Sequence, residues 1–66
     1  MYTLFSNTEE HQLNEYTSTL YLISSNSLHY NNYLLNNHIL KEGSKKECID
    51  YMNEINSNLV SNLIIL

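Results

Sequence analysis

The 66-residue chain has no proline, no tryptophan and no arginine, and it contains one glycine and one cysteine. A single cysteine excludes an internal disulfide, and one cysteine with three scattered histidines does not supply the paired ligands of a zinc site. A chain this short buries only about 60% of the surface that its unfolded form exposes, so its stability is marginal. We therefore expect association, with itself or with a partner, to add the missing stability.

Positive charge is scarce as well. Three lysines stand against seven acidic residues, which gives a net charge of -4. Nucleic-acid-binding domains usually carry a basic face, because contacts to phosphate supply most of their affinity. We expect no direct binding to nucleic acid.

Long apolar runs are also missing. No stretch approaches the roughly 20 apolar residues that cross a bilayer. The first residues, MYTLFSNTEEH, lack the positive segment and apolar run of a secretory signal. We expect a cytoplasmic protein without membrane contact.

Without proline, nothing interrupts a helical pattern in the first 41 residues. Apolar and small side chains recur there at spacings of three and four, at Leu13, Tyr16, Leu20, Ile23, Ser27, Tyr30 and Leu34. The patch Ser24–Ser27 is a weak point, because serine and asparagine side chains compete for backbone hydrogen bonds. The pattern predicts helices at about residues 8–24 and 27–41, or one long helix if the patch does not break it.

The segment KEGSKKECID, residues 41–50, predicts the end of one helix and the start of another. Gly43 suits a left-handed helix end, and Ser44 with Glu47 forms a capping-box pattern. Apolar residues then continue at helical spacing from Cys48, which predicts a third helix at about 45–63. Cys48 itself is expected to be a small buried residue rather than a reactive thiol.

These patterns predict an all-α protein. Residues 1–66 would form a single domain, a helical hairpin or a three-helix variant, and the short turn would make neighbouring helices antiparallel. Because so small a domain has marginal stability alone, we expect a homo-oligomer. The opening residues MYTLF fit one short extended segment.

Chemistry is sparse. The histidines, His11, His29 and His38, do not share a helical face, and no nucleophile stands with a base and an orienting group. The acids Glu9, Glu10 and Glu15 fit an exposed helix start, and the three lysines fit a solvated turn. We expect no enzymatic activity, no catalytic residue, no cofactor and no metal.

Six tyrosines in so short a chain are unusual, and tyrosine is enriched at protein interfaces. Two apolar rows in the first helical region exceed what one short antiparallel helix covers. We therefore predict a partner-binding surface made of Leu20, Ile23, Tyr30, Tyr33, Leu34 and Leu35. An aspartate at Leu20 or Leu34 would abolish the binding function if the variant folds.

One family shares part of this pattern. The residues Glu15-Tyr16, Thr19, Leu20, Ile23, Asn32, Tyr33 and Leu40 resemble the motif of the ANR proteins, small helical regulators of Gram-negative pathogens. The chain departs from that motif at Tyr33, Asn37 and Leu40, where the family has tryptophan, arginine and an aromatic residue. The resemblance implies a negative regulator that binds an AraC-type transcription activator of virulence genes and blocks its dimerisation.

Two alternatives stay open. The segment KEGSKKECIDYMNEINSNLV resembles the second helix of hairpin phosphatases that act on sporulation response regulators. The Ser-x-x-x-Asp motif of that family is replaced by Met52 and Asn56, so the resemblance implies a hairpin without the activity. The other alternative is an antitoxin-like or structural subunit that is folded only in a complex.

Overall fold

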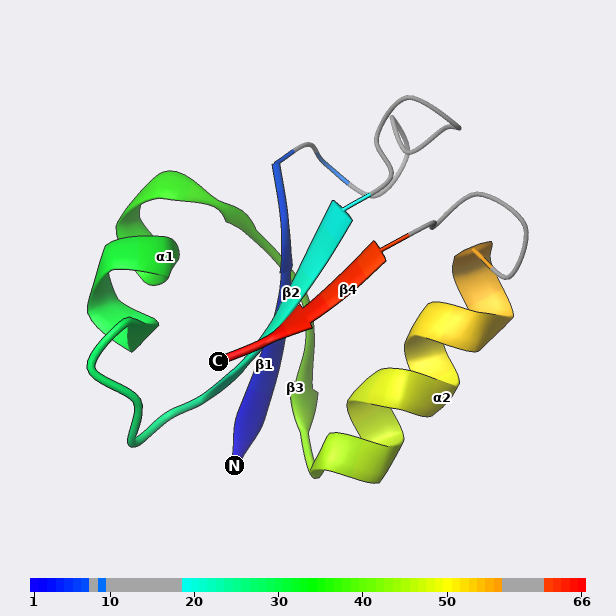
Figure 1. Cartoon of the computed structure of the whole chain (residues 1–66). Helices are drawn as coiled ribbons and strands as arrows, with labels where there is room; N and C mark the ends of the chain where they lie inside the picture. The colour runs from blue at the N-terminus through cyan, green and yellow to red at the C-terminus, as the bar shows by residue number, and fades with distance from the viewer. Residues whose placement is uncertain (8, 10–18, 57–61) are drawn as a thin grey trace.

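Two helices lie on opposite faces of a four-stranded β-sheet (Figure 1). The structure is a computed structural model, and it describes residues 1–7, 9, 19–56 and 62–66. In chain order the elements are β1 (Tyr2–Ser6), β2 (Thr19–Ser24), α1 (Tyr30–Asn36), β3 (His38–Gly43), α2 (Lys45–Asn56) and β4 (Asn62–Ile65).

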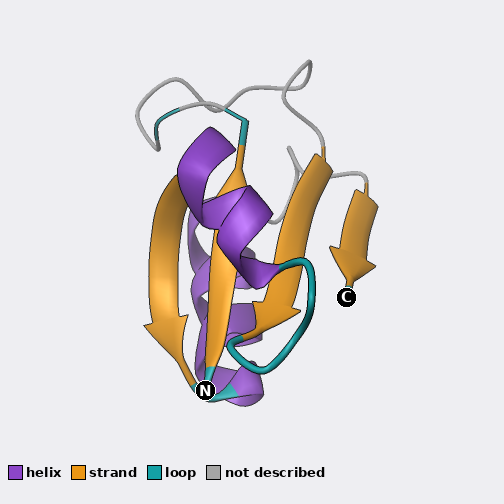
Figure 2. Cartoon of the chain, turned by 90° about the vertical axis from the view of Figure 1, so that its left-hand side faces the viewer, coloured by secondary structure: helices purple, strands orange, loops and turns teal. Residues whose placement is uncertain are grey.

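The strand order across the sheet is β3-β1-β2-β4. Strand β1 is antiparallel to both β2 and β3, and β2 is parallel to β4, so β1 alone runs against the other three. The crossovers β2-α1-β3 and β3-α2-β4 therefore travel in opposite directions across the sheet. Both are right-handed (Figures 1 and 2), as such connections nearly always are. Two right-handed crossovers in opposite directions place α1 and α2 on opposite faces.

The prediction of an all-α protein is wrong, because a sheet forms the centre of the described part of the chain. Of the helix predicted at 8–24, residues 19–24 form β2, and residues 8 and 10–18 lie outside the described residues. Of the helix predicted at 27–41, only Tyr30–Asn36 is helical, and β3 follows. The chain does turn after Ser24, but the turn ends a strand rather than a helix.

The sequence TLYLIS is misleading because β2 is apolar on both faces. Leu20 and Leu22 are buried on the α2 side, and Ile23 is buried on the α1 side. A strand between two helical layers loses the alternation of apolar and polar residues that usually identifies strands. Its apolar residues also fit spacings of three and four, so periodicity alone does not separate the two structures.

The third predicted helix is partly right. Helix α2 begins at Lys45, as the capping pattern predicts, but it extends only to Asn56. Residues 57–61 lie outside the described residues, and Asn62–Ile65 forms strand β4 instead of a last helical turn. The extended segment expected at MYTLF is confirmed as β1, one of the two central strands.

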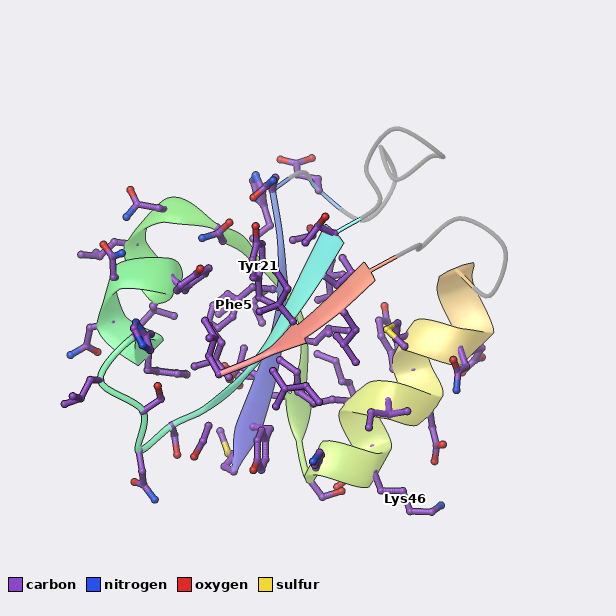
Figure 3. All side chains as sticks on the ribbon, viewed as in Figure 1. Phe5, Tyr21 and Lys46 are labelled. Atoms are coloured by element: carbon purple, nitrogen blue, oxygen red, sulfur yellow. The ribbon has the colours of Figure 1, made fainter. Side chains whose placement is uncertain are left out.

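The core has two layers. On the α2 side, Leu4, Leu20, Leu22 and Cys48 are fully buried, and Leu40, Ile49, Met52 and Leu63 pack against them. On the α1 side, Phe5 is fully buried, and Figure 3 shows Phe5 and Tyr21 between the sheet and α1. Thr3 and Ile23 are also fully buried on this side.

The junction between β3 and α2 is a reciprocal hydrogen-bonded cap. The Ser44 backbone N–H donates to Glu47 Oε1 at 3.1 Å, and the Glu47 N–H donates to Ser44 Oγ at 3.1 Å. Gly43 has φ +155°, and a Cβ there would lie 3.2 Å from the Glu47 carboxyl group. The predicted capping box is thus confirmed, but Gly43 ends a strand and not a helix.

A candidate protein-interaction surface on α1

Helix α1 has little stability of its own. It is seven residues long, YNNYLLN, and the side chain of its N-cap residue His29 makes no capping hydrogen bond. Neither end carries a charged residue that would suit the helix dipole, and none of its residues is fully buried. Asparagine is a weak helix former, and a helix this short is marginal without tertiary contacts. Its contacts with the sheet must therefore hold it.

Two tyrosines provide those contacts. Tyr30 and Tyr33 are three residues apart and so lie on one side of α1. The Phe5 ring is 5.9 Å from the Tyr30 ring in an edge-on arrangement and 6.2 Å from the Tyr33 ring. The rings of Tyr21 and Tyr33 are 4.9 Å apart, and the Tyr30 hydroxyl is hydrogen-bonded to Thr3 Oγ1 at 3.3 Å. This ring cluster fixes which side of α1 faces outward.

The outward side carries leucine. Leu35 follows Tyr33 by two positions, about 200° around the helix, and it is 84% exposed. Leu28, in the turn before α1, is 99% exposed. Leu34 and Ile39 are exposed at 40% and 45% on the flanks. We call these four residues, Leu28, Leu34, Leu35 and Ile39, the α1 surface.

Charge is distributed unevenly between the two helical layers. The sequence has no Asp, Glu, Lys or Arg from residue 16 to residue 40, so α1 and the turns beside it are uncharged. Helix α2, in contrast, carries an exposed series of charged residues, including the ion pair of Lys46 Nζ with Asp50 Oδ2 at 3.2 Å. Figure 3 shows Lys46 directed away from the sheet. Glu42, the register partner of Thr3, lies near the end of β3 and borders the α1 side.

Exposed leucine on an uncharged layer resembles the buried core of an interface, which is apolar and depleted of charged residues. Contiguous exposed apolar residues on a monomer commonly mark an interaction site. The charged outer face of α2 has the composition of a solvated helix. The α1 surface is therefore the candidate functional site of this protein.

The six predicted partner-binding residues fall into two groups. Leu20 and Ile23 are completely buried, so neither is accessible to a partner in this structure, and Leu20→Asp would test folding rather than binding. The other four lie on α1, where Tyr30 and Tyr33 pack against the sheet. Only Leu34 and Leu35 of the six are exposed at the α1 surface. Leu28 and Ile39 belong to the second apolar row of the sequence, with Leu22 and Leu35, but they were not included in the predicted binding surface. The uncharged run from residue 16 to residue 40 is the signal that would have indicated them.

The thiol of Cys48 is buried, as predicted. Its Sγ lies 3.7 Å from the carbonyl oxygen of Tyr2 and 3.9 Å from that of Lys41, as a donor to both. Burial, with a smaller contribution from the nearby Glu47 charge, raises the pKa of the Cys48 thiol. The protonated form is thus favoured, and this thiol is a poor nucleophile.

The remaining ionisable residues do not gather into a reaction centre. Lys41 Nζ lies 5.7 Å from the centre of the Tyr51 ring, and Lys46 is in the ion pair with Asp50. Across residues 1–7, 9, 19–56 and 62–66, no group of three or more His, Cys, Asp or Glu side chains is placed to hold a metal ion. His11, Glu10 and Glu15 lie outside the described residues. Neither helix in this part of the chain has the length and hydropathy needed to cross a membrane.

Comparisons of the chain with protein-family models, with curated proteins and with solved structures give no match. The helical spacing behind the ANR resemblance is not present at Thr19, Leu20 and Ile23, which lie in β2. The helical hairpin implied by the phosphatase resemblance is also not formed, because a strand and not a helix precedes α2. The ANR family and its regulatory role therefore stay predictions.

Proposed function

We propose that this protein acts by binding another protein through the α1 surface, without a reaction of its own. The observation that carries the proposal is the 99% and 84% exposure of Leu28 and Leu35 on an uncharged layer. A matching partner would present an apolar patch without charge, because a charged partner group would lose its hydration there with no opposite charge to compensate.

The free energy available to such a contact is substantial. Burying one leucine side chain that was exposed contributes about 1.5–3 kcal/mol. Leu28 and Leu35 have almost their whole side-chain surface available for that burial. Leu34 and Ile39 add smaller areas at the flanks. A few residues that become fully buried typically dominate the affinity of an interface.

A transcription factor is the partner class that we propose first. The ANR resemblance implies an activator whose dimerisation is blocked, and dimerisation surfaces are apolar. The net charge of -4 is compatible with a regulator that does not itself compete for DNA phosphates. In this mechanism the α1 surface occupies the apolar surface of the activator and so prevents its dimerisation.

The test compares four immobilised baits in extracts of cells that naturally express the protein. These are the wild type, Leu28→Asp, Leu35→Asp and the control Asn53→Asp. Asn53 is an exposed residue of α2, so the control adds the same negative charge to the opposite layer. Circular dichroism first establishes that each bait is folded.

We expect one partner to be retained by the wild type and by Asn53→Asp, and its affinity to fall at least about thirtyfold for Leu28→Asp and Leu35→Asp. If no captured protein distinguishes the two leucine variants from the control, the α1 surface is not the binding site. If a partner does distinguish them, it is purified and titrated against the wild-type protein and the same three variants, which measures the loss of affinity directly.

A further inference from the structure

Strand β4 is an edge strand, with Leu63 packed against the core and the following residues more exposed. In the described part of the chain it pairs only with β2, in parallel register, so its other edge has no partner strand. Helix α2 packs against β3 and β1, and the tyrosine rings of α1 lie against Phe5 of β1 and Tyr21 of β2. Figure 2 shows β4 at the margin of the sheet, beyond both helices.

Two side chains of β4, Ile64 and Ile65, are exposed, one on each face. Ile64 is the register partner of Tyr21, which places it on the α1 side, and it is 40% exposed. Ile65 is the register partner of Leu22, which places it on the α2 side, and it is 50% exposed. None of the four residues of β4 is charged, so the strand itself carries no charged side chain on either face.

The two edges of the sheet differ in this respect. The other edge strand, β3, has a bulge opposite Leu4 and Phe5, and it carries Lys41 and Glu42. Bulges and charged residues are the usual devices that prevent an edge strand from pairing with another chain. Strand β4 has neither device, and its residues Leu63, Ile64 and Ile65 are apolar.

The direction of the backbone groups of β4 follows from one hydrogen bond. The Leu66 N–H donates to the Leu22 carbonyl oxygen at 3.0 Å, so the backbone groups of Leu66 point toward β2. Backbone groups alternate along a strand, so those of Ile64 also point toward β2. The N–H and C=O groups of Leu63 and Ile65 therefore point outward, at the open edge.

We propose that a second copy of this chain pairs with β4 in antiparallel orientation, about a two-fold axis at Ile64. In this register Leu63 of each copy faces Ile65 of the other, so the outward groups of these two residues form four interchain hydrogen bonds. The two Ile64 residues face one another as a non-hydrogen-bonded pair, the pair type in which side chains are closest. The four strands of each copy then form one continuous sheet of eight.

A second copy fits this edge for two reasons. The two-fold pairing is isologous and closed, so it satisfies the outward groups of β4 without creating a new open edge of the same kind. The meeting strands are uncharged, so two chains of net charge -4 approach at a surface where no like charges face one another. Because the axis is perpendicular to the sheet, both α1 helices lie on the same face of the dimer.

The test introduces charges of either sign at Ile64. In the proposed dimer the Ile64 residues of the two copies face one another across the axis. Ile64→Lys puts two lysines directly opposite one another, Ile64→Glu puts two glutamates opposite, and like charges in that arrangement destabilise a strand pair. We expect sedimentation equilibrium to show a wild-type dimer and a dissociation constant at least about thirtyfold higher for each variant alone. An equimolar mixture of the two variants should form a heterodimer, because lysine then faces glutamate.

Asn53→Lys and Asn53→Glu place the same charges on the exposed face of α2 and should dimerise like the wild type. Ile65→Pro provides a second test, because it removes an outward N–H and leaves the bonds from Ile64 and Leu66 to β2 in place. This variant should fold and be monomeric.

A wild type that is monomeric at the highest concentrations used for nuclear magnetic resonance would overturn the proposal. So would a mixture of Ile64→Lys and Ile64→Glu that is no more associated than either variant alone. Neither result would affect binding through the α1 surface, which is measured with Leu28 and Leu35.

Discussion

The two hydrogen bonds between Ser44 and Glu47 fix the residue at which α2 begins. The Glu47 carboxylate accepts from the Ser44 backbone N–H, and a Cβ at residue 43 would make a tight contact of 3.2 Å with it, so a residue without a side chain is favoured there. Gly43 satisfies this requirement and also adopts a positive φ that side chains disfavour. The side chain of Glu47 therefore acts on both sides of the junction. It caps the start of α2 and restricts the residue that ends β3.

This cap predicts a specific dependence of stability on pH. Hydrogen bonds from Ser44, the backbone one first, lower the pKa of Glu47 from its ordinary value of 4.5. The contribution of the carboxylate to stability is therefore complete above about pH 4.5 and is lost as the pH falls through the lowered folded-state pKa. Between about pH 5 and pH 3, the free energy of unfolding should fall more steeply for the wild type than for Glu47→Gln.

Urea unfolding at a series of pH values measures the two slopes. Glu54→Gln removes one carboxylate from an exposed position of the same helix and leaves the cap intact, so it controls for net charge. Parallel curves for the wild type and Glu47→Gln would show that the cap does not depend on the charge of Glu47.

Features of this scale were predictable from sequence where they are local. The capping box involves Ser44 and Glu47, three residues apart, and its geometry is almost independent of the rest of the fold. The burial of Cys48 followed from its place in the apolar stripe of the same helix. Leu20 and Ile23 were predicted to bind a partner because of their apolar spacing, but both are buried in the core.

At the scale of elements, α1 depends on the ring cluster beneath it. Tyr33 contacts both Phe5 and Tyr21, and its carbonyl oxygen accepts the Asn37 N–H at 2.9 Å. Aromatic pairs contribute about 0.5–1.5 kcal/mol each beyond the area they bury. Tyr33→Ala removes two such pairs, so it should reduce the stability of α1 by about 1–3 kcal/mol.

Hydrogen exchange of backbone amides checks this prediction. The α1 amides should exchange faster in Tyr33→Ala, while the β1 amides, which are paired on both sides, keep most of their protection. Asn31→Ala, at an exposed position of α1, should not speed exchange, because alanine is the better helix former. Equal loss of protection in α1 and β1 would mean that α1 is not a separate cooperative unit.

Whether a segment forms a helix or a strand was harder to predict from sequence than the capping box at the start of α2. Strand β2 lies between two helical layers, so Tyr21 and Ile23 are apolar on one face and Leu20 and Leu22 on the other. Its apolar residues are compatible with helix and strand alike. In chain order α1 lies between β2 and β3, and the sequence pattern placed β2 in the helix predicted at 8–24 and merged α1 with most of β3 in the helix predicted at 27–41. Only tertiary contacts distinguish these structures.

At the scale of the whole molecule, the sheet order β3-β1-β2-β4 is set by pairings between distant parts of the chain. Strand β2 pairs with β4 across some 40 residues, and no local pattern specifies such a contact. The sequence did predict a general property, that 66 residues leave apolar surface exposed. The structure shows this surplus at Leu28 and Leu35 on α1 and at Ile64 and Ile65 on β4.

If β4 pairs with a second copy, stability and concentration are linked, because the dimer is lost when the chain unfolds. Well above the dissociation constant, each tenfold increase in protein concentration should stabilise the dimer by about 1.4 kcal/mol. Because two chains share this free energy, each chain gains about 0.7 kcal/mol. For a domain of this size that corresponds to a rise of about 3–5 °C in the thermal midpoint. Circular dichroism melts over two decades of concentration measure it. Ile64→Lys should melt at a temperature that does not change with concentration, and the same independence in the wild type would mean that β4 does not pair in solution.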